Sequence, residues 1–159
     1  MKVSQKEILS LFKLKQYGDI IEKLSCLEPD PVSVNGPIAI GNLFRKKWGS
    51  TKQECFFVAA LDGAHKLISA EMITKGLINR TVVHPREVFR FAILHNSAAI
   101  IVGHNHPSGQ TNPSEEDKKI TERLVNAGEV IGINVLDHII VSQKTWVSFC
   151  ELGIMPNGD

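Results

Sequence analysis

The sequence predicts an α/β domain with a mixed sheet covered by helices, and three features lead to this prediction. Short apolar runs of strand length alternate along the chain with segments whose apolar residues recur at helical spacing. Gly and Pro residues separate these segments, as turns between elements require. The chain has 159 residues, which is the usual size of one domain. Interleaved strands and helices of this kind pack as a sheet with helices on its faces.

The main domain is predicted to span residues 51–159. Its first strand, Cys55–Leu61, is a continuous apolar run, as in strands that are buried on both faces. Asp62 and Gly63 then indicate a turn, and Pro85 is well placed to open a helix. The remaining expected elements are a hairpin partner at 66–74, a candidate short strand at 81–83, a helix at 86–95, a strand at 98–102, a helix at 114–127, and strands at 135–141 and 146–149.

Residues 1–50 are predicted to form a short N-terminal helical segment. Ser4 and Glu7 have the spacing of a capping box, which favours a helix start. Residues 27–36 contain two prolines and a glycine, as linkers often do. Pro37 then favours a second helix that ends near Gly49.

Composition narrows the classes of partner and compartment. The formal net charge is +1, so charge gives no strong argument for nucleic acid or an anionic membrane surface. Cys26, Cys55 and Cys150 lie far apart, and such spacing suggests reduced thiols rather than disulfides or a thiolate metal site. No apolar stretch approaches the roughly 18 residues that a membrane span needs. We therefore expect a cytoplasmic protein with no membrane association.

A candidate metal site follows the predicted strand at 98–102. Side chains alternate along a strand, so His104 and His106 are expected on the same side at its carboxyl end. Pro and Gly residues turn the following loop, and the chain returns to Asp117 in the first turn of the next helix. Two histidines and one carboxylate are a typical ligand set of catalytic Zn²⁺, with the fourth position left for water.

The same residues also have structural interpretations. A His-x-His pair is often no more than two polar residues on a loop. Ser114 at an N-cap, with the acidic Asp117 three residues later, favours a helix start whether or not a metal is near. Spacing alone leaves both interpretations open.

Several motifs together resemble one family. The pattern His104-x-His106, followed by Ser114 and Asp117, is similar to the signature of JAMM (JAB/MPN) metalloprotease domains. The segments HNHPSG, NPSEED, VVHPREVF and LDHIIVS resemble the RadC-type branch, and the resemblance covers about residues 51–150. It implies a three-layer JAB/MPN architecture, similar to that of cytidine deaminases, and zinc bound by His104, His106 and Asp117.

The resemblance also implies roles for the neighbouring residues. Glu54, at the start of a strand, takes the place of the family's general acid/base, and Ser114 that of the residue stabilising the oxyanion. Asn105 stands where many members have Ser or Thr. His138 is either a residue that supports the metal ligands or a buried histidine of a strand. Zinc in such a site activates a water for attack on a carbonyl carbon.

The preferred functional hypothesis is a zinc-dependent peptidase or isopeptidase acting on a protein or peptide substrate. The alternative is a RadC-type, DNA-repair-associated module that binds zinc and recruits DNA-processing partners without peptidase activity. A deaminase is disfavoured because the His-x-Glu and Pro-Cys-x-x-Cys signatures are absent. With no Gly-x-Gly hairpin before Glu54 and a charge near zero, we expect only non-specific nucleic-acid binding, at about 10⁻⁴–10⁻⁶ M. The sequence leaves the scissile bond and the oligomeric state open.

Overall fold

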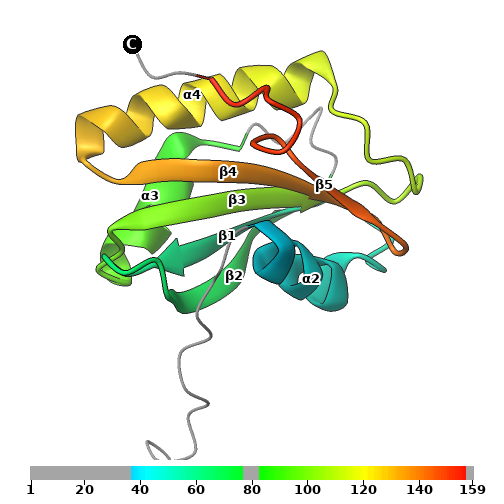
Figure 1. Cartoon of the computed structure of the whole chain (residues 1–159), viewed down its shortest axis with the longest axis horizontal. Coiled ribbons are helices and arrows are strands. Elements are labelled where there is room, and N and C mark those ends of the chain that lie inside the picture. Colours follow the sequence, from blue (N-terminus) through cyan, green and yellow to red (C-terminus); the bar gives the residue numbers. More distant parts are fainter. Residues whose placement is uncertain (1–36, 77–82, 157–159) are drawn as a thin grey trace, which may run out of the picture. The chain divides into compact units, whose positions relative to one another are not determined.

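The computed structural model describes residues 37–76 and 83–156, which form a five-stranded mixed sheet with helices on both faces (Figure 1). The elements in chain order are α2 (Pro37–Trp48), β1 (Cys55–Leu61), β2 (Leu67–Lys75), α3 (Pro85–Leu94), β3 (Ala99–Asn105), α4 (Glu115–Ile131), β4 (Asn134–Val141) and β5 (Trp146–Ser148). The prediction of an α/β fold with a mixed, helix-covered sheet is therefore confirmed. The helix and linker expected before residue 37 lie outside the described residues, as does most of the candidate strand at 81–83, whose last residue, Val83, is buried but not in a strand.

The order and direction of the strands bring three strand ends together at one end of the sheet. The order is β2-β1-β3-β4-β5, with β3 parallel to β4 and β1 antiparallel to both of its neighbours. Helix α4 makes the crossover between β3 and β4, as parallel strands require. The carboxyl ends of β3 and β4 therefore meet the amino end of β1, and the register pairs Phe56 with His104 and Asn105 with Val141.

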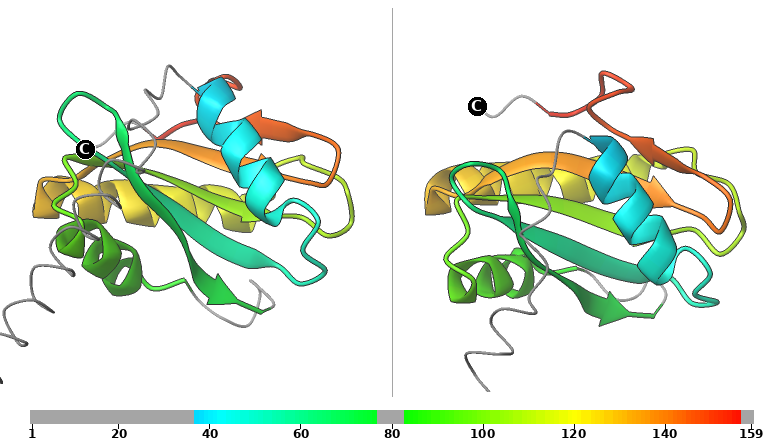
Figure 2. Two further views of the ribbon diagram at one scale, coloured as in Figure 1. Left: turned by 90° about the horizontal axis from the view of Figure 1, so that it is seen from below. Right: turned by 60° about the horizontal axis from the view of Figure 1, so that its bottom comes forward.

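The two faces of the sheet carry separate apolar cores. Alternating side chains of β1 and β3 point to α3 and α4 on one face and to α2 on the other. Figure 2 shows the sheet from below, with α2 on one face and α3 and α4 on the other. The α3/α4 side includes Phe56, Val58, Ile100, Val102, Phe89 and Leu124, and the α2 side includes Phe57, Ala59, Ile101, Ile139, Ile40 and Phe44. In the ranges that the structure describes, no helix is both long enough and apolar enough to cross a bilayer.

Strand β3 is longer than the sequence predicts. The apolar run ends at Val102, but pairing with β1 and β4 continues through Gly103 and His104 to Asn105. Gly103 permits this because a Cβ there would lie 2.5 Å from the Phe57 ring and 2.7 Å from the Ile139 carbonyl oxygen. The first candidate ligand is thus held by strand pairing on both sides. Helix α4 is also longer than predicted and ends where Gly132 adopts a left-handed conformation (φ 80°).

Candidate metal centre

Three side chains that the sequence singled out meet at this edge of the sheet. His104 Nε2 lies 2.8 Å from His106 Nε2 and 3.2 Å from Asp117 Oδ1, and His106 Nε2 lies 3.8 Å from Asp117 Oδ2. One ligand atom from each residue falls within 4.8 Å of the other two. His104 and Asp117 are buried, whereas His106 is half-buried and faces the surface. The cluster is therefore compact and accessible from one side.

The loop after β3 fixes the His106 ring. The His106 backbone N–H donates to the Val141 carbonyl at 2.8 Å, which extends the β3–β4 pairing by one residue. Its ring Nδ1 lies 2.7 Å from the Gln110 carbonyl oxygen. Gly109 allows the chain to turn back this sharply because it adopts a positive φ of 87°. A carbonyl can only accept, so Nδ1 carries the proton and Nε2 presents a lone pair to the cluster.

Asp117 is oriented by the start of helix α4. Ser114 is the N-cap, and the capping box that the sequence predicts is present in both directions. The Ser114 backbone N–H donates to Asp117 Oδ2 at 2.8 Å, and its hydroxyl donates to the same oxygen at 2.7 Å. Asp117 Oδ1 is left to face the histidines. One carboxylate therefore serves the helix start and the cluster at once.

His138 and Thr121 support His104 from behind. His138 lies on β4 and is fully buried, with its Nε2 2.8 Å from His104 Nδ1. Its Nδ1 lies 2.6 Å from the hydroxyl oxygen of Thr121, which donates its own proton to the Asp117 carbonyl oxygen. The Thr121 oxygen therefore accepts from His138 Nδ1–H, and His138 Nε2 accepts from His104 Nδ1–H. This chain of bonds places the Nδ1 proton of His104 towards His138 and turns its Nε2 towards the cluster.

The cluster has the chemistry of a metal-ligand set. Two imidazole nitrogens and a carboxylate oxygen converge, which is a ligand set that binds divalent metal ions. Burial raises the pKa of the Asp117 carboxyl, but hydrogen bonds and charge from His104, with hydrogen bonds from Ser114, outweigh burial and hold the pKa well below its usual value. Burial, and then the charge of His104, lowers the pKa of His138, which keeps this supporting imidazole neutral. The residues fit a divalent ion such as Zn²⁺.

Asn105, between the two histidines, points to the opposite side of the strand. Its side-chain oxygen accepts from the Cys55 backbone N–H at 2.7 Å, and its amide nitrogen donates to the Thr51 and Gln53 carbonyls at 2.9 and 3.0 Å. Asn105 is fully buried. It therefore ties the segment that carries Glu54 to the strand that carries His104.

Replacing Asn105 by alanine is expected to lower the free energy of unfolding by about 1–3 kcal/mol, because the buried Cys55 N–H and the partly buried carbonyls of Thr51 and Gln53 lose their partner. Urea unfolding in the presence of a chelator measures this without a contribution from metal binding. Asn112→Ala, an exposed change in the loop after β3, is the control and should cost less than about 0.5 kcal/mol. Equal destabilisation by the two variants would contradict the role given to Asn105.

Glu54 lies beside the cluster rather than in it. It precedes β1, is half-buried, and its carbonyl accepts from the Gly76 backbone N–H at 2.9 Å. Following the register of Phe56 with His104 back by two residues brings Glu54 level with His106. Glu54 and Pro107 line a common pocket of about 360 Å³. Glu54 therefore lies at the same end of the sheet as the cluster, next to the loop that carries His106.

Comparison with known proteins agrees with this geometry. The profile of the RadC-like JAB domain family matches residues 34–154, a range that contains the sheet, α2 and every candidate site residue. The chain belongs to the RadC-like JAB domain family. The resemblance that the motifs suggested is therefore confirmed, and the possible His/Asp metal site is set in a JAMM-related fold.

Relatives of this RadC-like JAB domain are larger proteins. A UPF0758 protein of Alkaliphilus metalliredigens is 45% identical over 122 residues, which is 77% of this chain and 53% of the relative. A UPF0758 protein of Xylella fastidiosa (strain 9a5c) is 45% identical over 121 residues, 76% of this chain and 54% of the relative. A UPF0758 protein of Finegoldia magna is 45% identical over 119 residues, which is 75% of this chain and 53% of the relative. The chain therefore spans about half the length of the curated relatives it matches.

Two contributors to the site of the RadC-like JAB domain were not identified from the sequence. Thr121 lies four residues after Asp117, so the two share a helix face, and this spacing was the available signal. Asn105 was noted only as a departure from the common Ser or Thr. Because side chains alternate along a strand, the position of Asn105 between the two histidines places its side chain on the opposite side from theirs. His84, in the VVHPREVF segment, is the N-cap of α3, where its Nδ1 accepts from the Arg86 N–H.

Proposed function

We propose that this domain is a zinc-dependent hydrolase that cleaves a peptide or isopeptide bond in a protein or peptide substrate. The observation that supports this best is the pair of histidine Nε2 atoms, 2.8 Å apart, that face the Asp117 carboxylate. His104, His106 and Asp117 would hold the ion. Three protein ligands leave a coordination position open, as catalytic zinc sites require and structural ones lack.

The bound ion would act as a Lewis acid and lower the pKa of a water to about 7. Glu54 is the proposed general acid/base: its carboxylate takes a proton from the attacking water and later delivers it to the nitrogen of the leaving amine. Its position in the lining of a pocket that also includes Pro107, the residue after His106, supports this role.

Ser114 is the proposed donor to the oxyanion of the tetrahedral intermediate. Its hydroxyl now donates to Asp117 Oδ2, so this role requires rotation about the Cα–Cβ bond of Ser114. Asp117 Oδ2 keeps the Ser114 backbone N–H as a donor after that rotation. Ser114 is an exposed residue, which supports the proposal.

The proposal predicts cleavage that depends on zinc. Zinc-loaded protein is incubated with a peptide library and with lysine-linked isopeptides, and products are identified by mass spectrometry. Removing zinc with a chelator is expected to abolish cleavage, and one equivalent of Zn²⁺, but not Mg²⁺, is expected to restore it. Cleavage that survives the chelator, or no cleavage of either library by the zinc-loaded protein, would overturn the proposal.

A further inference from the structure

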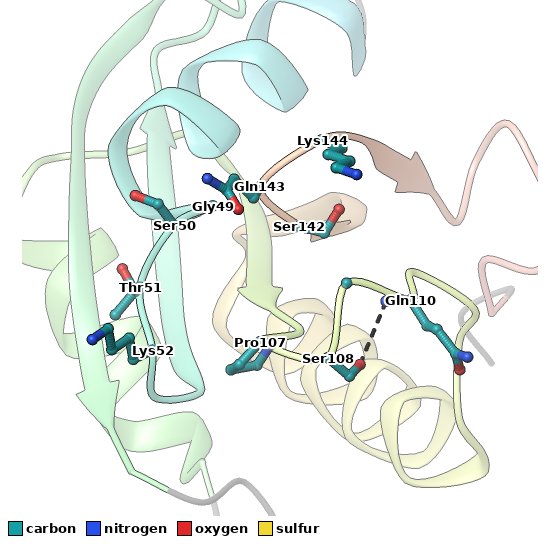
Figure 3. Close-up of a pocket in the computed structure, with 11 residues that line it drawn as sticks. Gly49, Ser50, Thr51, Lys52, Pro107, Ser108, Gln110, Ser142, Gln143 and Lys144 are labelled. Carbon is teal, nitrogen blue, oxygen red and sulfur yellow. Dashed lines mark hydrogen bonds between the residues drawn. The ribbon is translucent and has the colours of Figure 1, made fainter.

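A hollow of about 680 Å³ opens at the loop that follows His106, and three chain segments surround it (Figure 3). They are residues 49–52 after α2, residues 107–110 after β3, and residues 142–144 between β4 and β5. Its volume is in the range of ligand pockets. It shares lining residues with the pocket that contains Glu54 and with a third hollow of about 410 Å³ on α2. We call these three adjoining hollows the basic groove.

Hydrogen bonds hold the walls of the basic groove in place, two of them from Asn105 and His106 of the candidate metal centre. Asn105 binds the Thr51 carbonyl, and the His106 ring binds the Gln110 carbonyl. The turn at 142–145 is closed because the Ser142 hydroxyl both donates to the Thr145 carbonyl and accepts from the Thr145 N–H. A groove with walls fixed in this way loses little conformational entropy when it binds a ligand.

Apart from Glu54, the charged residues that line the basic groove are all positive. Lys52 and Lys144 line the central hollow, and Arg45 and Lys46 line the hollow on α2, while no Asp or Glu lines either. All four cations are exposed, and the whole chain has a net charge of only +1, so the positive charge is local. Basic residues in the last turn of α2 suit the helix dipole, but this does not account for Lys52 and Lys144, which lie on loops.

The uncharged lining suits a peptide better than a nucleic acid. The central hollow presents Ser, Thr and Gln side chains, which hydrogen-bond readily to peptide backbone and carboxylates. Aromatic side chains, on which unpaired bases stack, are absent from the described lining of all three hollows. Trp48, near this end of α2, stacks instead on Phe57 in the core, with ring centroids 4.5 Å apart.

We propose that the basic groove binds an extended peptide segment rich in Asp and Glu and leads it to the candidate metal centre. This inference rests on the proposed function and specifies its substrate class. The acidic side chains would pair with Lys52, Lys144 and the α2 cations, and the bond to be cleaved would lie between Glu54 and His106.

Fluorescence anisotropy on zinc-loaded Glu54→Gln protein tests binding without turnover. The probes are an Asp/Glu-rich peptide, the same peptide with Asn and Gln, and a single-stranded deoxyoligonucleotide of equal charge. The acidic peptide is expected to bind about tenfold more tightly than its amide counterpart, and Lys52→Gln with Lys144→Gln to remove about that factor. Lys66→Gln with Arg90→Gln, exposed cations outside the groove, is the matched control and should leave affinity unchanged.

Raised salt should weaken binding of the acidic peptide and leave the amide peptide nearly unaffected. Lys144→Gln alone, on an exposed turn, repeats the test if the double variant unfolds. Equal affinity for the two peptides, undiminished binding by the groove variants, or tighter binding of the oligonucleotide would each overturn the inference. Binding without cleavage by the unaltered chain would leave the groove standing and reject the hydrolase. Cleavage with no preference for acidic peptides would support the hydrolase and reject the binding of acidic peptides by the groove.

Discussion

Purified Asp117→Asn and His104→Ala proteins are expected to contain no stoichiometric zinc, whereas the unaltered chain should contain about one ion. Each substitution removes one of three converging ligand atoms, and the affinity for zinc should fall by more than the roughly 10–100-fold that loss of a supporting residue costs. Elemental analysis after dialysis gives the content, and competition with a chromogenic chelator gives the affinity. His65→Ala, on the exposed turn between β1 and β2, should bind zinc like the unaltered chain.

Thr121→Val is expected to have a zinc affinity between those of the ligand variants and of the His65→Ala control. It keeps the side-chain shape but removes the oxygen that accepts from His138 Nδ1–H, so the tautomer of His104 is no longer fixed. Zinc affinity should fall by about 10–100-fold, between the ligand variants and the control. Full zinc content in Asp117→Asn would reject the ligand assignment. Unchanged affinity in Thr121→Val would reject only the supporting role of Thr121 and His138.

The positions of the candidate ligands could be predicted because their signals are local in the sequence. Alternation along a strand puts His104 and His106 on one side, and the Ser114 N-cap places Asp117 in the first turn of α4. The sheet could be predicted for the same reason, since β1 and β3 are nearly continuous apolar runs buried on both faces. These features need no knowledge of which strands pair.

The surroundings of the ligands could not be predicted because they depend on that pairing. His138 reaches His104 only because β4 lies parallel to β3, with Ile140 level with His104. Asn105 reaches residues 51–55 only because β1 runs antiparallel on the other side of β3. The same strand order places Lys144 across from Lys52. A net charge of +1 gave no sign of this local group of cations.

The position of Glu54 follows from strand pairing too, although its identity came from family resemblance. The amino end of β1 and the carboxyl end of β3 lie at one edge, and Asn105 bonds to the residues on both sides of Glu54. Glu54 is therefore held beside the candidate ligands without contributing to their cluster. A general base that is distinct from the ligands should be separable from them by mutation.

Glu54→Gln is accordingly expected to retain about one zinc ion per chain and to lower kcat by about 10²–10⁴-fold on any substrate that the unaltered chain cleaves. Glutamine keeps the size of the side chain and its ability to hydrogen-bond, but it cannot accept the proton of the attacking water. Glu122→Gln, an exposed change on α4, should leave both zinc content and kcat unaltered. Zinc content and turnover are measured on the same preparation. Loss of zinc from Glu54→Gln would make Glu54 a ligand or a folding residue, and full turnover with zinc retained would assign the proton transfer to another group.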